Sequence, residues 1–308
     1  MSTFNWNTIE SDPGIFTEMV EKLGCPNIQF KELYSLDDIE TLDRIKPIEG
    51  IVLLFEYDKR ALTYFQSEFC GIDTKEYPDL FFAKQVVNNA CATQAILSVL
   101  LNLKTIDVGS TLQQFKESAM KLSPYDRGVA IGKSDIIRKT HNEFAQPSQA
   151  LQERISNKFS GVTGKAHHFI GIIPYNGILL MLDGLSEDPI VIGGAEDDWV
   201  TTGVKPFFEG LCKALSGSLD FTILAVVHNQ VNKYKELYER AVEEKSDMAT
   251  TYKSMFEEEI QKRKKEREEN TRRKHDYMPL ALHVLLLMGK YGKLEQQVTR
   301  AEEEAQKS

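Results

Sequence analysis

The amino-acid sequence predicts an α+β protein: a central antiparallel sheet flanked by helices, followed by an all-helical C-terminal extension. Helical and strand signals alternate through residues 1–230, and a turn signal joins two of the predicted strands. Residues 231–308 are dense in Lys, Arg and Glu and contain a single proline, Pro279. The chain has 308 residues, 42% of them hydrophobic, which is enough for a buried core. We therefore predict a main domain over 1–230 and a helical extension over 231–308.

Capping residues and short apolar runs justify the elements of the main domain. SDPGIFTEMVEKLG begins a helix with Asp12 as N-cap and Pro13 at the first helical position, and Gly24 ends it. Further helices are predicted at 110–122 and 134–144. The predicted strands, short and bounded by Gly, Pro or Asp, are 51–57, 168–174, 177–183 and 221–228. The polar stretch 143–164 is predicted to be a long functional or disordered connection.

Composition narrows the classes of function. The chain carries a formal charge of −9, and the acidic excess lies in residues 1–230, which favours a basic partner. The basic stretch 261–275 is interleaved with glutamates, which indicates a solvated helix face rather than a nucleic-acid site. The four cysteines, Cys25, Cys70, Cys91 and Cys212, lie far apart without a CxxC pair, so we expect reduced thiols and no metal. We also expect no signal peptide, no membrane span and no cofactor, and a cytoplasmic and nuclear location.

Cys91 is placed where a helix would stabilise a thiolate. In NNACATQAILSVLLN the apolar residues recur with helical spacing from Ala92 onward, and Asn88 or Asn89 is predicted to cap the helix. Unpaired N–H groups and the positive end of the helix dipole would then lie beside the sulfur. A small buried structural cysteine explains the same pattern. The helix alone does not distinguish these two possibilities.

A reactive thiol needs a base and a group to orient it. His167 and His168 begin one predicted strand, Asp183 ends the next, and PYNG lies between them as a turn. With a loop of four residues or of two, His168 and Asp183 share one face of the hairpin, directly opposite or diagonal; a three-residue loop would select His167 instead. A hairpin-end ion pair is the plain alternative. Gln85, six residues before Cys91, could donate hydrogen bonds to a tetrahedral oxyanion.

These residues resemble the ubiquitin C-terminal hydrolase family of cysteine proteases. The resemblance is carried in order by Gln85-x3-Asn89-Ala90-Cys91, by His168-Phe169 and by Leu182-Asp183-Gly184, and it spans essentially the whole chain. The stretches WNTIESDPGIFTEMVEKLGC, DDWV and NTRRKHDYMPLALHVLLLM are similar to the proteasome-associated subgroup that has a C-terminal extension. Ala92 follows the nucleophile where many members of the family have Gly.

The resemblance implies a papain-like, knotted α+β domain and assigns roles. Cys91 would be the nucleophile, His168 the base and Asp183 its orienter, with Gln85 and the Cys91 N–H as the oxyanion hole. The segment 143–164 would be the crossover loop that limits the leaving group. The residues implied to contact ubiquitin are Asp12, Gly14, Ile15, Phe16 and Asn88. A helix cap explains the SDPGIF stretch equally well.

The C-terminal extension is predicted to bind a partner. YMPLALHVLLLMGKYGKLEQQV indicates an apolar helix started by Pro279, a break at Gly289 to Gly292, and a final amphipathic helix. Such a surface either packs on the main domain or binds another protein, and the resemblance implies the ubiquitin-receptor subunit of the proteasome. The resemblance also implies that the substrates of the whole protein are ubiquitin conjugates.

Two other functions remain open from the sequence. The chain could be a ubiquitin-binding scaffold whose cysteine is unreactive. It could also be another acyl-transfer enzyme that uses a Cys-His-Asp triad. The leading prediction is a deubiquitinating thiol protease.

Overall fold

A seven-stranded antiparallel sheet forms the centre of the molecule, in a computed structural model that describes residues 6–145, 167–216 and 220–305. The strand order is β1-β7-β2-β4-β5-β6-β3, and each neighbouring pair is antiparallel. The strands are β1 (Ile28–Glu32), β2 (Ile48–Glu56), β3 (Cys70–Gly71), β4 (His167–Tyr175), β5 (Ile178–Leu182), β6 (Ile190–Gly194) and β7 (Phe221–His228). The predicted α+β class is confirmed.

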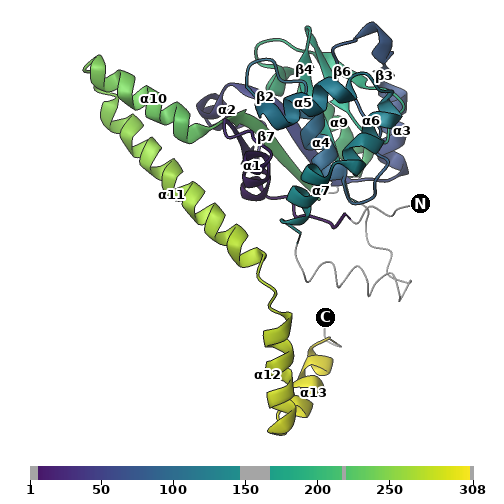
Figure 1. Cartoon of the computed structure of the whole chain (residues 1–308), viewed down its shortest axis with the longest axis vertical. Coiled ribbons are helices and arrows are strands. Elements are labelled where there is room, and N and C mark those ends of the chain that lie inside the picture. The colour runs from purple at the N-terminus through teal and green to yellow at the C-terminus, as the bar shows by residue number, and fades with distance from the viewer. Residues whose placement is uncertain (1–5, 146–166, 217–219, 306–308) are drawn as a thin grey trace.

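Helices cover both faces of the sheet (Figure 1). One core cluster joins the sheet to α1 (Pro13–Lys22), α4 (Cys91–Leu100), α5 (Gly109–Ala119), α6 (Pro124–Lys133) and α7 (Asp135–Asn142). The other joins it to α2 (Ile39–Ile45), α3 (Lys59–Glu68), the π-helical turn η2 (Val200–Val204) and α9 (Lys205–Ala214). A 3₁₀ turn, η1, spans Thr74–Glu76.

The alternation of side chains along β2 explains the two cores. Ile51, Leu53 and Phe55 point into the cluster beneath α2, α3 and α9, whereas Val52 points into the cluster beneath α4. Because successive residues of a strand face opposite sides, a strand buried on both sides is almost continuously apolar. β2 therefore belongs to the middle layer of three, a sheet with helices packed on both of its faces.

The structure confirms the predicted first helix and the four predicted strands. Asp12 Oδ1 accepts a hydrogen bond from the Ile15 N–H at 3.0 Å, Pro13 begins α1, and Gly24 has φ +101° beyond its end. The predicted helices at 110–122 and 134–144 correspond to α5 and α7. Residues 146–166 lie outside the described part, so most of the predicted connection at 143–164, and the knot that would involve it, stay predictions.

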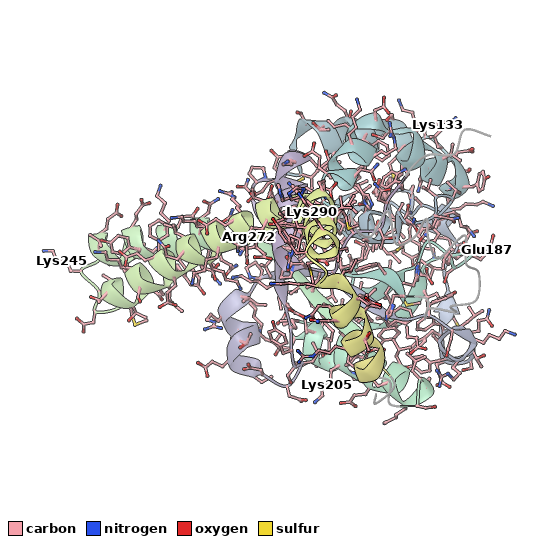
Figure 2. All side chains as sticks on the ribbon, turned by 90° about the horizontal axis from the view of Figure 1, so that it is seen from below. Lys133, Glu187, Lys205, Lys245, Arg272 and Lys290 are labelled. Carbon is pink, nitrogen blue, oxygen red and sulfur yellow. The ribbon has the colours of Figure 1, made fainter. Side chains whose placement is uncertain are left out.

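The C-terminal residues form a helical hairpin and a terminal helix pair. α10 (Gln230–Glu243) and α11 (Ala249–Arg273) run antiparallel, with Lys245 at the tip that projects from the body in Figure 2. α12 (Met278–Lys290) carries Pro279 in its first turn, and α13 (Leu294–Ala305) follows the predicted glycine break. In the described part of the chain, no helix combines the length and the apolar character needed to cross a membrane.

α11 packs back onto α1 through polar contacts. Arg263, which is 5% exposed, lies 2.8 Å from Glu21 and 2.6 Å from Glu266 of its own helix. Asn270 Nδ2 donates to the Gly14 carbonyl at 3.1 Å, and Arg273 lies 3.0 Å from Asp12. The division of the chain at residue 230 stays a prediction, because the extension contacts the first helix of the main domain.

Candidate active site

Cys91 is the first residue of α4 and is half-buried. The predicted cap is wrong: the N-cap is Ala90, whose methyl group cannot accept a hydrogen bond from the helix. The backbone of Asn89 is in the left-handed region, with φ +63°. Asn89 instead donates from Nδ2 to the Trp6 carbonyl at 3.2 Å, and Asn88 is exposed. The first turn of α4 therefore keeps N–H groups that no side-chain cap occupies, next to the sulfur.

The hairpin β4–β5 brings His168 and Asp183 together. Tyr175 pairs with Ile178, so the loop consists of Asn176 and Gly177, whose φ angles of +49° and +84° suit a tight hairpin turn. This is the two-residue alternative of the prediction, in which Asp183 is the diagonal neighbour of His168. His168 Nε2 lies 2.7 Å from Asp183 Oδ1. His168 is buried, whereas His167 is exposed on the opposite face.

Asp183 is held by the turn that follows it. Its Oδ1 accepts a second hydrogen bond from the Leu185 N–H at 2.8 Å, and its Oδ2 accepts one from the Ser186 hydroxyl at 3.2 Å. The carboxylate is 1% exposed. A buried charge needs such partners, because burial of an unpaired carboxylate is costly.

The electrostatics of His168 favour the charged imidazolium. Burial lowers its pKa, but hydrogen bonds from the ring to Asp183 and Cys91, together with the charges of both groups, outweigh burial and raise the pKa to about 9. A carboxylate can only accept, so Nε2 carries the proton that faces Asp183 and Nδ1 is left for the sulfur. His168 thus bonds Asp183 through Nε2, and the Cys91 side chain lies near enough on its other side to help raise its pKa.

The segment 83–85 is hydrogen-bonded both to the residue after Asp183 and to α4. The backbone N–H of Gln85 donates to the Gly184 carbonyl at 2.8 Å, and Gln94 of α4 donates to the Ala83 carbonyl at 2.7 Å. The side-chain amide of Gln85 donates to the Val87 carbonyl at a long 3.4 Å, and its buried Oε1 has no partner in the described part. Its role as an oxyanion donor stays a prediction.

The structure corrects part of the implied ubiquitin-contact set. Ile15 and Phe16 are 1% and 0% exposed, so as core residues they cannot form a contact surface. Gly14 is covered by the side chain of Glu266, and Asp12 caps α1 and pairs with Arg273. Of this set, Asn88 alone is exposed.

The arrangement defines a class of protein. A cysteine at a helix N-terminus, an imidazole beside it, and a buried carboxylate bonded to the imidazole are the parts of a thiol hydrolase. Within residues 6–145, 167–216 and 220–305, no group of three His, Cys, Asp or Glu side chains could hold a metal ion. The residues present supply nucleophilic and acid–base chemistry.

The chain belongs to the ubiquitin carboxyl-terminal hydrolase family. The family described as "Ubiquitin carboxyl-terminal hydrolase, family 1" matches residues 6–213, and a C-terminal region of ubiquitin carboxyl-terminal hydrolases matches residues 249–294. It is a deubiquitinating thiol hydrolase, and it resembles the extended subgroup as the sequence indicated.

Relatives of similar architecture span most of the chain. It is 38% identical to "Ubiquitin carboxyl-terminal hydrolase isozyme L5" of Dictyostelium discoideum, over 79% of this chain and 68% of that protein. It is 35% identical to "Ubiquitin carboxyl-terminal hydrolase ubh-4" of Caenorhabditis elegans, over 94% and 89%. Trichinella spiralis UCH37, solved bound to ubiquitin vinyl methyl ester, superposes with a TM-score of 0.67 at 30% identity, covering 85% of this chain and 99% of that one.

Sequence reasoning missed the neighbours that hold α4 from the side. Thr93 Oγ1 lies 2.7 Å from His141 Nδ1, and His141 Nε2 lies 2.6 Å from the Asn7 carbonyl. A histidine within an otherwise amphipathic helix was the only local signal. Its partners are 48 and 134 residues away in the sequence, so spacing could not reveal them.

Proposed function

We propose that this chain hydrolyses the bond after the C-terminal glycine of ubiquitin with Cys91 as nucleophile. His168 acts as base and then as acid, and Asp183 orients it. The observation that carries the proposal is the buried 2.7 Å contact of His168 with Asp183 beside Cys91, whose side chain, together with Asp183, raises the pKa of the imidazole. An unreactive scaffold has no need of a buried charged pair aimed at a thiol.

The reaction follows from the order of these contacts. The imidazole takes the thiol proton, and the thiolate attacks the glycine carbonyl to form a tetrahedral intermediate. The imidazolium then protonates the leaving amine, which departs and leaves a thioester. Water, activated by the neutral imidazole, attacks the thioester and releases the free carboxylate and the thiol. Asp183 keeps Nδ1 directed at the sulfur throughout.

The oxyanion of each tetrahedral intermediate needs donors near Cys91. The N–H of Cys91 is one candidate because it is the first N–H of α4 and has no carbonyl partner within the helix. Gln85 is the second, since its amide nitrogen has two N–H groups and makes one long contact, to the Val87 carbonyl at 3.4 Å. Removal of one such donor costs about 10²-fold to 10³-fold in kcat in comparable enzymes.

The substrate class follows from the family and from charge. The family acts at the carboxyl terminus of ubiquitin, and a lysine isopeptide supplies the leaving amine. The acidic excess of the main domain complements the basic face of ubiquitin and steers association. Ubiquitin conjugates are therefore the proposed substrates.

Hydrolysis of ubiquitin with a C-terminal fluorogenic amide tests this function. We expect turnover by the wild type, none by Cys91→Ala, and a kcat lower by about 10²-fold for Gln85→Ala. Cys70→Ser is the matched control, because Cys70 is exposed and lies in β3. Turnover by Cys91→Ala, or equal loss in Cys70→Ser, would contradict the proposal.

We also propose that the terminal helices bind the ubiquitin-receptor subunit of the proteasome, which would place the protein in the cytoplasm and nucleus. α12 has no buried residue, and its large apolar side chains are exposed, for example Leu280 at 61% and Leu286 at 64%. Exposed apolar area of this kind usually marks a protein interface.

Calorimetry with the recombinant receptor subunit tests the partner. Leu280→Glu and Leu286→Glu should each weaken binding, whereas Leu122→Glu, also exposed but on the main domain, should not. Binding that is unaffected by both α12 changes would argue against this partner surface. A fluorescent fusion found outside the cytoplasm and nucleus would contradict the proposed location.

A further inference from the structure

The segment Trp6–Asn7 runs beside the N-terminal end of α4. Asn89, two residues before Cys91, donates from Nδ2 to the Trp6 carbonyl at 3.2 Å. The Asn7 N–H donates to Oδ1 of Asn142, the last residue of α7, at 3.1 Å. The chain is therefore fixed on one side to α7 and on the other to the residues that lead into α4.

His141 connects this segment to α4 from the other side of Cys91. The imidazole is 0% exposed and its ring centroid lies 4.7 Å from that of Trp6. The Asn7 carbonyl can only accept, so Nε2 carries the proton and donates to it at 2.6 Å. Nδ1 must then accept, and the Thr93 hydroxyl donates to it at 2.7 Å.

The charge state of His141 suits a fixed structural link. Burial lowers the pKa of His141 to about 4, although the hydrogen bond to Asn7 opposes this. The imidazole is consequently neutral in neutral solution, with each nitrogen committed to one partner. Thr93 lies two residues after Cys91 and is itself fully buried.

An uncapped helix end explains why such a link is needed. A polar side chain at the N-cap would stabilise the first turn of α4 by accepting from the N–H of the second or third helical residue. Ala90 leaves these donors free and leaves the turn without a cap. Asn89 and Thr93, on either side of Cys91, are instead held by the carbonyl of Trp6 and, through His141, by that of Asn7.

We propose that Thr93 and His141, with Asn89, are positioning residues that hold the first turn of α4 and so set the place of the Cys91 sulfur relative to His168. The inference rests on the proposed role of Cys91 as nucleophile. None of the three contacts the reacting atoms; they act through the backbone of α4. Small displacements matter, since a misplacement of about 1 Å can cost about 10²-fold in rate.

Two substitutions of Thr93 separate positioning from stability. Thr93→Val keeps the shape and removes the hydroxyl, whereas Thr93→Ser keeps the hydroxyl. We expect Thr93→Val to lower kcat by about tenfold with KM within about twofold, because ubiquitin binding is not altered, and Thr93→Ser to restore kcat. The matched control is Thr17→Val, a fully buried threonine of α1 whose hydroxyl bonds Pro13 and Phe30 rather than α4.

The control should lose thermal stability comparably and keep kcat. Unchanged kcat in Thr93→Val, or an equal loss of kcat in Thr17→Val, would overturn the inference. If Thr93→Val does not fold, Asn89→Gly is the second variant: glycine accepts φ +63° and lacks the amide that reaches Trp6. It should also lower kcat, and wild-type kcat would overturn the proposal.

A ubiquitin-free measurement separates this inference from the proposed function. The rate at which iodoacetamide alkylates Cys91, read by peptide mass spectrometry against pH, reports the thiolate directly. Thr93→Val should shift this profile and Thr17→Val should not. A shifted profile together with wild-type protein that fails to cleave the ubiquitin substrate would reject the function and keep the positioning. Identical alkylation profiles for the wild type and Thr93→Val, together with normal cleavage of the ubiquitin substrate by the wild type, would reject the positioning role of Thr93 and keep the proposed function.

Discussion

His168 Nε2 lies 2.7 Å from Asp183 Oδ1, across a hairpin whose two-residue loop makes these residues diagonal neighbours on one face. The contact fixes which ring nitrogen is left for Cys91. It also makes the imidazole more basic, despite burial that acts in the opposite direction. The site therefore depends on hairpin register as much as on residue identity.

Asp183→Asn should lower kcat/KM by about 10²-fold or more, because an amide can stabilise the wrong imidazole tautomer and supplies no negative charge. The alkaline limb of the pH–rate profile, set by loss of the His168 proton near pH 9 in the wild type, should move to lower pH. Steady-state kinetics from pH 5 to 10 measure both effects.

Ser186→Ala is the control for Asp183→Asn. It removes the 3.2 Å hydrogen bond to Oδ2 and leaves the Oδ1 contact with His168 intact. Its alkaline limb should stay close to that of the wild type. An unmoved limb in Asp183→Asn would show that Asp183 does not control His168.

The stability conferred by His168 should fall as the pH rises. Its folded pKa of about 9 lies above the unfolded value of 6.5, so the contribution is complete below pH 6.5 and is lost as the pH rises through 9. The free energy of unfolding of the wild type minus that of His168→Asn should therefore be larger at pH 6 than at pH 9.5. Urea denaturation of both proteins at the two pH values measures this difference in unfolding free energy. A difference that grows with pH would refute the raised pKa assigned to His168.

Gly184→Ala should impair catalysis through Gln85. A Cβ at residue 184 would lie 2.9 Å from the Gln85 Cβ and 3.0 Å from the Gln85 nitrogen, which donates to the Gly184 carbonyl. Displacement of Gln85 should lower kcat by about tenfold or more. Gly194→Ala, where a Cβ meets nothing within 4 Å, is the matched control and should retain wild-type kcat. Equal kcat in the two variants would contradict the claim that close packing of Gly184 positions Gln85.

Arg263→Ala should release α11 from α1. Loss of this buried guanidinium leaves Glu266 unpaired and weakens the hold on Glu21, at a cost of about 3 kcal/mol. Hydrogen exchange of the α11 amides should accelerate. Arg272→Ala, which breaks an exposed pair with Glu269 of the same helix, should change exchange little. Equal exchange in both variants would mean that Arg263 does not anchor the helix.

The elements that sequence predicts best are those with local chemical signals. Asp12, Pro13 and Gly24 bound α1 by capping chemistry alone. PYNG marks the turn between His168 and Asp183, but the sequence left its loop length open, and the structure selects the two-residue alternative. The three candidate catalytic residues, Cys91, His168 and Asp183, could likewise be predicted from the sequence, because each lies at the start or end of a predicted element. The fold class and the candidate site were predictable to that extent.

The rest depends on distant contacts. β1 escaped prediction because Gln29 and Lys31 look solvent-facing, yet both are buried and reach Glu259 of α11, some 230 residues away. The N-cap of α4 was predicted wrongly because Asn89 bonds the Trp6 carbonyl instead of its own helix. Ile15 and Phe16 were assigned to a contact surface by resemblance, whereas packing places them in the core.

Reaction with ubiquitin vinyl methyl ester tests the central claim most directly, because the electrophile stands where the scissile carbonyl would lie. Peptide mapping should find the adduct on Cys91 alone among the four cysteines, absent in Cys91→Ala and formed far more slowly in His168→Asn. An adduct on another cysteine, or unchanged labelling without the imidazole, would contradict the account.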